Sequence, residues 1–180
     1  MSSKTNTVTT QLADQLDYHW THALRPRLDG LTDDEYFWEP VPGCWTVHRD
    51  GRIDFEFPEP DPTPFTTIAW RLAHLIVGVL AMRNHSHFGG PPADYQSWQY
   101  ATDAATALRQ LDEAYRKWIA GVRGLTDDDL DRPIGPAEGQ WAEHPFSELI
   151  LHINREMIHH GAEIACIRDL YANSPEKKEK

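Results

Sequence analysis

The strongest constraint on the fold of this chain is an apolar repeat of 3.5 residues between positions 104 and 122. The side chains that make it are Ala104, Leu108, Leu111, Tyr115, Trp118 and Val122. Such a repeat lines up one narrow stripe on a helix, which is typical of a helix packed against other helices. The repeat therefore predicts a helix over about residues 101–123 with one buried face.

Three more segments show helical periodicity and are bounded by turn-forming residues. They cover about residues 8–28, 65–88 and 145–171. Pro26 is expected to kink or end the first, Gly89-Gly90-Pro91-Pro92 to stop the second, and Pro145 to open the last. With four such segments, we expect an all-α protein, an antiparallel four-helix bundle.

A long proline-rich connection separates the first two predicted helices, and residues 40–64 should form the longest non-helical excursion. Within it, residues 45–48 and 53–57 alternate polar and apolar side chains around an Asp50-Gly51 pair. This pattern is compatible with a small β-hairpin.

The length and composition suit one globular domain. The chain has 180 residues, of which 40% are hydrophobic and 25% charged. We expect the domain over residues 1–172 and a polar tail over residues 173–180.

Cys44 and Cys166 lie far apart with no C-x-x-C pair, no apolar signal core opens the chain, and no apolar run is long enough to span a bilayer. A cytoplasmic location is therefore expected.

The same composition bears on partners. A formal net charge of -11 argues against nucleic acid, which requires clustered Lys and Arg. No membrane partner is expected. The seven Trp and six Tyr residues exceed what one core of this size should bury, so a homodimer packed through an aromatic helix face is a further hypothesis.

The last predicted helix carries polar residues where its buried stripe should be apolar. At heptad spacing the stripe reads Phe146, Leu149, Ile153, Glu156, His160, Glu163, Ile167, Leu170. Burying an unpaired carboxylate or imidazole is costly, so these positions need a partner, and a metal ion is such a partner. Glu156 and His160 stand four residues apart, which places them one above the other on a helix face where they can bind one ion.

His74, in the second predicted helix, is the expected third ligand. Gly78 and Ala81 follow it on the same side and leave space beside it, and Trp70 and Trp45 are candidates for the wall of that space. Three protein ligands with an open position are typical of catalytic rather than structural zinc sites.

Other interpretations of these residues stay open at this point. His74 could be a hydrogen-bonded core residue, and Glu156 with His160 could form a buried ion pair. His19, on the stripe of the first predicted helix, is the chief rival as third ligand. Glu163 could hold His160 or a water molecule, or pair with an arginine elsewhere.

This combination resembles the DinB-like (YfiT-like) superfamily, four-helix bundles with a three-residue metal site. The resemblance covers nearly the whole chain, and Arg155-Glu156-Met157-Ile158-His159-His160 is similar to the R-E-x3-H motif of mycothiol-dependent maleylpyruvate isomerases. It implies that His74, Glu156 and His160 bind the metal. A more typical H-x3-H alignment would instead select His159 and Arg155. Because an arginine cannot serve as that ligand, the Glu156/His160 register is preferred.

The resemblance implies a metal-dependent thiol S-transferase or isomerase that joins a low-molecular-weight thiol, such as mycothiol or bacillithiol, to a small electrophile. Zinc is the expected metal, and nickel, iron(II) or manganese would also suit two imidazoles and one carboxylate. The isomerases have a further C-terminal domain, which is not expected here, so that specific reaction is not expected either. Two other functions remain open: a non-catalytic metal- or ligand-binding stress protein, and a metal-dependent hydrolase with Glu163 as base.

Overall fold

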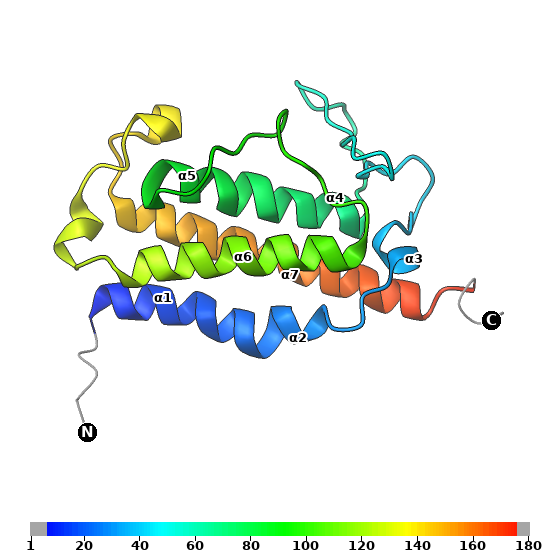
Figure 1. Cartoon of the computed structure of the whole chain (residues 1–180), viewed down its shortest axis with the longest axis horizontal. Coiled ribbons are helices and arrows are strands. Elements are labelled where there is room, and N and C mark those ends of the chain that lie inside the picture. Colours follow the sequence, from blue (N-terminus) through cyan, green and yellow to red (C-terminus); the bar gives the residue numbers. More distant parts are fainter. Residues whose placement is uncertain (1–6, 176–180) are drawn as a thin grey trace.

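All regular secondary structure in the described part of the protein is helical. The structure is a computed structural model, and it describes residues 7–175. Four long helical segments lie side by side, and no strand occurs among the described residues (Figure 1). The prediction of an all-α fold is confirmed. None of the helices within residues 7–175 is long and apolar enough to cross a membrane.

Two of the long segments combine α-helical and π-helical turns. The first consists of α1 (Val8–His19), η1 (Trp20–Leu24, π-helical) and α2 (Arg25–Arg27). The second consists of α4 (Ile68–Ala73), η2 (His74–Ala81, π-helical) and α5 (Met82–Phe88). Below, "the first long helix" means residues 8–27 and "the second long helix" means residues 68–88.

The other two long segments are uninterrupted α-helices. They are α6 (Ala104–Arg123) and α7 (Phe146–Ala172). Shorter helices lie in the connections: α3 (Asp33–Tyr36), and the 3-10 turns η3 (Asp128–Asp131) and η4 (Pro136–Trp141). Residues 176–180 of the expected polar tail lie outside the described residues.

Side-chain caps explain where three of the long helices begin. The side chains of Thr7, Thr67 and Asp103 each accept a hydrogen bond from a backbone N–H in the first turn of the following helix. Pro145, predicted as the first helical residue, stands instead at the N-cap of α7, so the helix begins one position later, at Phe146. Gly89 ends the second long helix with a φ of 62°, a conformation that glycine adopts without strain.

The second long helix and α6 run in the same direction, which differs from the expected antiparallel order. Asn84 donates to the carbonyl of Ala114 at 2.9 Å, and one turn later Phe88 lies edge-on to Trp118 at 5.2 Å between ring centroids. The two chains therefore advance together. The connection over residues 89–103 must run back along the second long helix before α6 can start, as Figure 1 shows.

The longest connection covers residues 37–67 and includes the predicted excursion. The expected hairpin is reduced to a tight turn. Val47 and Ile53 form a single antiparallel bridge, and His48 donates its backbone N–H to Arg52 at 2.7 Å. Gly51 supplies the positive φ of 85° that this turn requires. A second isolated bridge, between Trp45 and Thr66, joins the two ends of this segment, but neither bridge extends into a strand.

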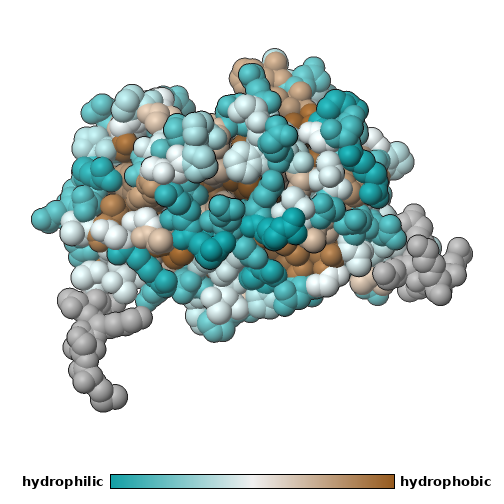
Figure 2. All heavy atoms as spheres, in the orientation of Figure 1, coloured by the Kyte–Doolittle hydropathy of each residue, from teal (hydrophilic) through white to brown (hydrophobic). Residues whose placement is uncertain are grey.

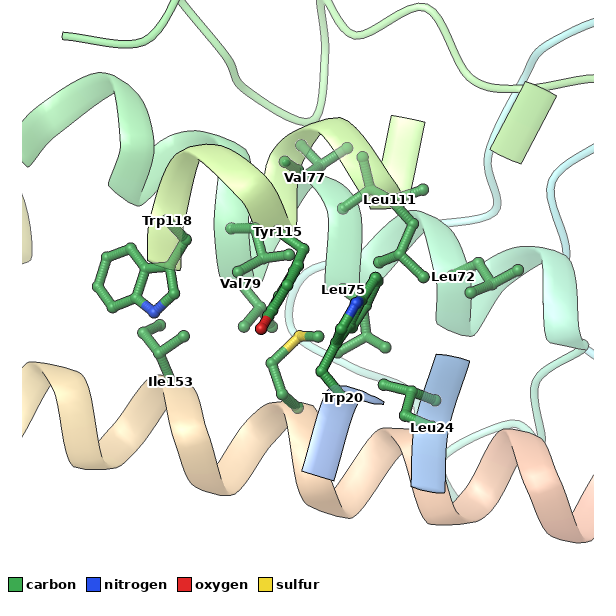
Figure 3. Close-up of a cluster of buried hydrophobic side chains, with 14 of the residues drawn as sticks. Trp20, Leu24, Leu72, Leu75, Val77, Val79, Leu111, Tyr115, Trp118 and Ile153 are labelled. Atoms are coloured by element: carbon green, nitrogen blue, oxygen red, sulfur yellow. The ribbon is translucent and has the colours of Figure 1, made fainter. Parts of the chain in front are cut away.

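The core lies between the four long segments (Figure 3). Trp20 stacks on Tyr115 with 3.9 Å between ring centroids, and Trp118 and Ile153 are fully buried. Most of the predicted stripe on α6 is buried, as its repeat requires. On α7 the predicted stripe ends early, because Leu170 is exposed beyond the core. Figure 2 shows polar side chains over most of the visible surface, with small apolar areas between them.

The parallel packing of the second long helix on α6 generates a stability prediction. A β-carbon at Gly121 would overlap the ring of Phe88. We expect Gly121→Ala to lower the free energy of unfolding by about 1–2 kcal/mol, because overpacking outweighs the gain in helix propensity. Denaturant unfolding measures this, with Ala120→Ser at an exposed neighbouring position as control. Adding Phe88→Leu to Gly121→Ala should restore stability; a Gly121→Ala variant as stable as the parent would contradict this packing.

Candidate metal centre

Three polar side chains from two helices converge at the interface between the second long helix and α7. His74 comes from η2, and Glu156 and His160 come from α7. Donor atoms of the three lie within 4.8 Å of one another. The structure thus brings together the three residues that the sequence analysis selected.

The distance between the donor atoms of Glu156 and His160 suits a shared metal ion. Two donors bound to one tetrahedral ion at about 2.0–2.1 Å lie about 3.3–3.4 Å apart. Nε2 of His160 and Oε2 of Glu156 are 3.4 Å apart, which is that spacing and is long for a hydrogen bond. The imidazole rings of His74 and His160 meet edge to face at 4.8 Å between centroids. Two imidazoles and one carboxylate are a donor set that zinc and related divalent ions accept.

His74 is held by a residue that the sequence analysis did not select, Tyr95. Nδ1 of His74 lies 2.8 Å from the Tyr95 hydroxyl. When Nδ1–H donates to that oxygen, Nε2 carries the lone pair that a metal requires. Tyr95 comes from the connection that runs back along the second long helix. No periodic pattern in that segment predicts its contact with His74.

Gly78 makes room for this contact. A β-carbon at Gly78 would overlap the Tyr95 hydroxyl. The open space expected beside His74 is instead filled by Tyr95. The glycine is therefore needed for close approach of a side chain that orients the histidine, rather than for a pocket.

Burial, together with the nearby His160, lowers the pKa of His74 to about 4. A histidine with such a pKa is neutral at pH 7, which is the protonation state that binds metal ions. His74 also begins the π-helical stretch η2, in which the N–H of Met82 bonds to the carbonyl of Val77, five residues earlier. π-Helical turns within α-helices are frequent at functional sites.

His160 is oriented by Glu163, one turn further along α7. Nδ1 of His160 lies 2.6 Å from Oε2 of Glu163, which leaves Nε2 directed at Glu156. Arg71, whose side chain is 13% exposed, forms an ion pair with the same oxygen of Glu163. Both roles suggested for Glu163 thus occur together: it holds His160 and it pairs with an arginine. A carboxylate behind a ligating histidine is a common arrangement in metal sites.

The second oxygen of Glu156 faces away from His160. Oε1 lies 3.5 Å from Nδ1 of His152 and 3.5 Å from Nε of Arg155. Neither contact is short, and the Glu156 side chain is 22% exposed. Arg155 therefore balances the charge of Glu156 without enclosing it.

His159 and His19, the rival ligands, lie elsewhere. The His159 side chain is 62% exposed, and its Nε2 is 3.5 Å from Glu163. His159, His160 and Glu163 also form a compact group, but Arg71 already neutralises Glu163 there, which makes that group a poorer cation site. His19 packs against Gly161 and belongs to neither group within the described residues.

The two tryptophans lie one behind the other beside His74, and only Trp70 stacks on the histidine ring. Trp70 is parallel to the His74 ring at 5.6 Å between centroids, and Trp45 lies 6.1 Å beyond Trp70. The indole N–H of Trp70 donates to the backbone carbonyl of Asp54 at 2.8 Å. Trp70 thus limits the movement of the histidine ring, and the long connection supports Trp70 in turn.

Tyr95 provides a test of this geometry. Tyr95→Phe removes only the hydroxyl and keeps the ring stacked on Phe55. If the cluster binds zinc, we expect the affinity to fall about 10- to 100-fold, as for other lost second-layer partners of metal ligands. Competition with a chromophoric chelator measures it. Tyr18→Phe, on an exposed side chain of α1, is the control. Equal affinities for both variants would show that the Tyr95 contact does not orient His74.

Comparison with known proteins gives one match. The family model described as DinB superfamily matches residues 15–164, a range that includes all three candidate ligands. Comparisons with curated proteins and with solved structures give no match. Because the family model covers well over half of the chain, the protein belongs to the DinB superfamily.

Proposed function

We propose that this protein binds one divalent metal ion, zinc first among the candidates, through His74, Glu156 and His160, and acts as a metal-dependent thiol S-transferase. The observation that carries the proposal is the convergence of three donors that each have an outer partner. Those partners are Tyr95 for His74, Glu163 for His160 and Arg155 for Glu156. Tyr95 and Glu163 lie within hydrogen-bond distance and orient the two histidines before the metal arrives, whereas Arg155 balances the charge of Glu156 from 3.5 Å.

A divalent ion with an open coordination position would lower the pKa of a thiol or a water molecule bound there. Tyr95 and Glu163 hold the two imidazole rings in a fixed orientation. His160 and Glu156 retain 16% and 22% side-chain exposure, so a small molecule can approach them. The co-substrates proposed are a low-molecular-weight thiol and a small electrophile.

A thiol suits this site better than water because the carboxylate that a hydrolase would need as a base is already engaged. Glu163, the base expected for a hydrolase, is held by Arg71 and His160. A thiol ionises near pH 8.5 and needs little help to become a thiolate, whereas water needs a strong base or a strongly activating metal. The similarity of residues 155–160 to the R-E-x3-H motif of mycothiol-dependent maleylpyruvate isomerases also supports a thiol.

Neighbouring histidines on α7 give a matched test of the metal site. We expect His160→Ala to lose stoichiometric zinc, because it removes a ligand. His159→Ala should keep it, because that side chain is mostly exposed and contacts only the outer carboxylate. Metal analysis of tag-free protein after gel filtration measures both. If His159→Ala lost zinc and His160→Ala kept it, His159 and not His160 would be the metal ligand on α7.

The thiol reaction is tested with purified bacillithiol or mycothiol and monochlorobimane as the electrophile. We expect zinc-loaded protein to accelerate thiol consumption and Glu156→Gln to abolish the acceleration. Stoichiometric zinc without acceleration would contradict the transferase and favour a metal- or ligand-binding protein. Turnover of p-nitrophenyl acetate without thiol would favour the hydrolase instead.

A further inference from the structure

A cavity of about 350 Å³ lies beside the candidate metal centre, between α7, the end of the second long helix and the connection over residues 124–145. Its wall includes His152 and Arg155. Both of these side chains also face Oε1 of Glu156 at 3.5 Å. The cavity is therefore separated from a candidate metal ligand by one layer of side chains.

Most charged groups in the cavity wall already have a partner within it. Glu138, whose side chain is 9% exposed, pairs with Arg83 at 3.1 Å and with His87 at 3.1 Å. Glu148 pairs with His144 at 2.7 Å. These groups balance one another and do not require a ligand.

Arg155 is different, because its carboxylate partner is Glu156, a candidate metal ligand. A divalent ion bound to Glu156 would take over the negative charge of that carboxylate. Arg155, with 68% side-chain exposure, would then be the cavity-wall cation without an anion to balance it. A guanidinium recognises carboxylates through two parallel hydrogen bonds, so an anionic ligand group is the natural replacement.

The rest of the cavity wall is apolar. Ile134 and Leu149 are buried side chains that form part of it, and the Trp141 indole lies at its edge with 53% exposure. Trp141 packs edge-on to His144 at 5.0 Å between centroids, which holds the indole in place. A broad, partly exposed indole next to apolar side chains suits a flat apolar body.

We propose that this cavity binds a small monocarboxylate with a flat apolar body, whose carboxylate pairs with Arg155. The inference deepens the proposed function and rests on metal binding by Glu156, because the metal is what releases Arg155. It assigns the electrophilic substrate to this class. Metal and carboxylate should therefore strengthen each other's binding, and by linkage the factor is the same in both directions.

The test compares benzoate with benzyl alcohol by isothermal titration calorimetry on zinc-loaded protein. The two molecules share a flat ring and differ in charge. We expect benzoate to bind at least about tenfold more tightly, since a charge-assisted pair is lost with the alcohol. Arg155→Gln should remove this preference. Arg116→Gln, with the same change of charge at an exposed position on α6, should keep it.

Zinc content is measured on every sample, so the two proposals fail in different ways. Absence of stoichiometric zinc in the parent protein overturns the proposed function and the coupling with it. Full zinc content with no benzoate preference overturns only the cavity inference. A preference that survives Arg155→Gln also overturns it, because the carboxylate would then bind at the metal itself. Zinc affinity that rises with benzoate in the parent, but not in Arg155→Gln, supports it.

Discussion

The structure depends on how α7 buries polar side chains against the second long helix, whose buried side chains are mostly apolar. A carboxylate or an imidazole inside a helix interface is costly unless every polar atom finds a partner. Arg71 of the second long helix supplies the partner for Glu163, and Glu163 in turn holds His160. The two helices are therefore joined through charge at the level of the candidate metal centre and through apolar packing elsewhere. Moving either helix along the other would break the Arg71–Glu163 ion pair and separate the His74 and His160 rings.

The direction of the helices contributes to the site. Because the second long helix and α6 run the same way, the chain must return along the second long helix over residues 89–103. That return path brings Tyr95 to His74. An ordinary antiparallel hairpin of helices would use a short turn and would place no residue there. The absent side chain of Gly78 completes the arrangement by leaving space for the tyrosine hydroxyl.

Charge balance explains why the cluster of His74, Glu156 and His160 is suited to a cation. Burial keeps His74 neutral, and Arg71 cancels Glu163. Glu156 has only long contacts, to His152 and Arg155. A charged carboxylate with loose contacts, next to two oriented imidazoles, is poorly satisfied by protein groups alone. A metal ion completes such a set, and its effect would pass through Arg155 to the neighbouring cavity.

The sequence alone determined what local geometry controls. The 3.5-residue repeat predicted α6, because a helix places residues three and four apart on one face. The same rule put Glu156 and His160 together, four apart on α7, and the polar break in an apolar stripe identified them. Only the tertiary structure decided the helix directions, the π-helical turns, the role of Tyr95 and the cavity beside Arg155. Each depends on contacts between residues distant in sequence, and a periodic pattern carries no information about which distant side chain fills a given space.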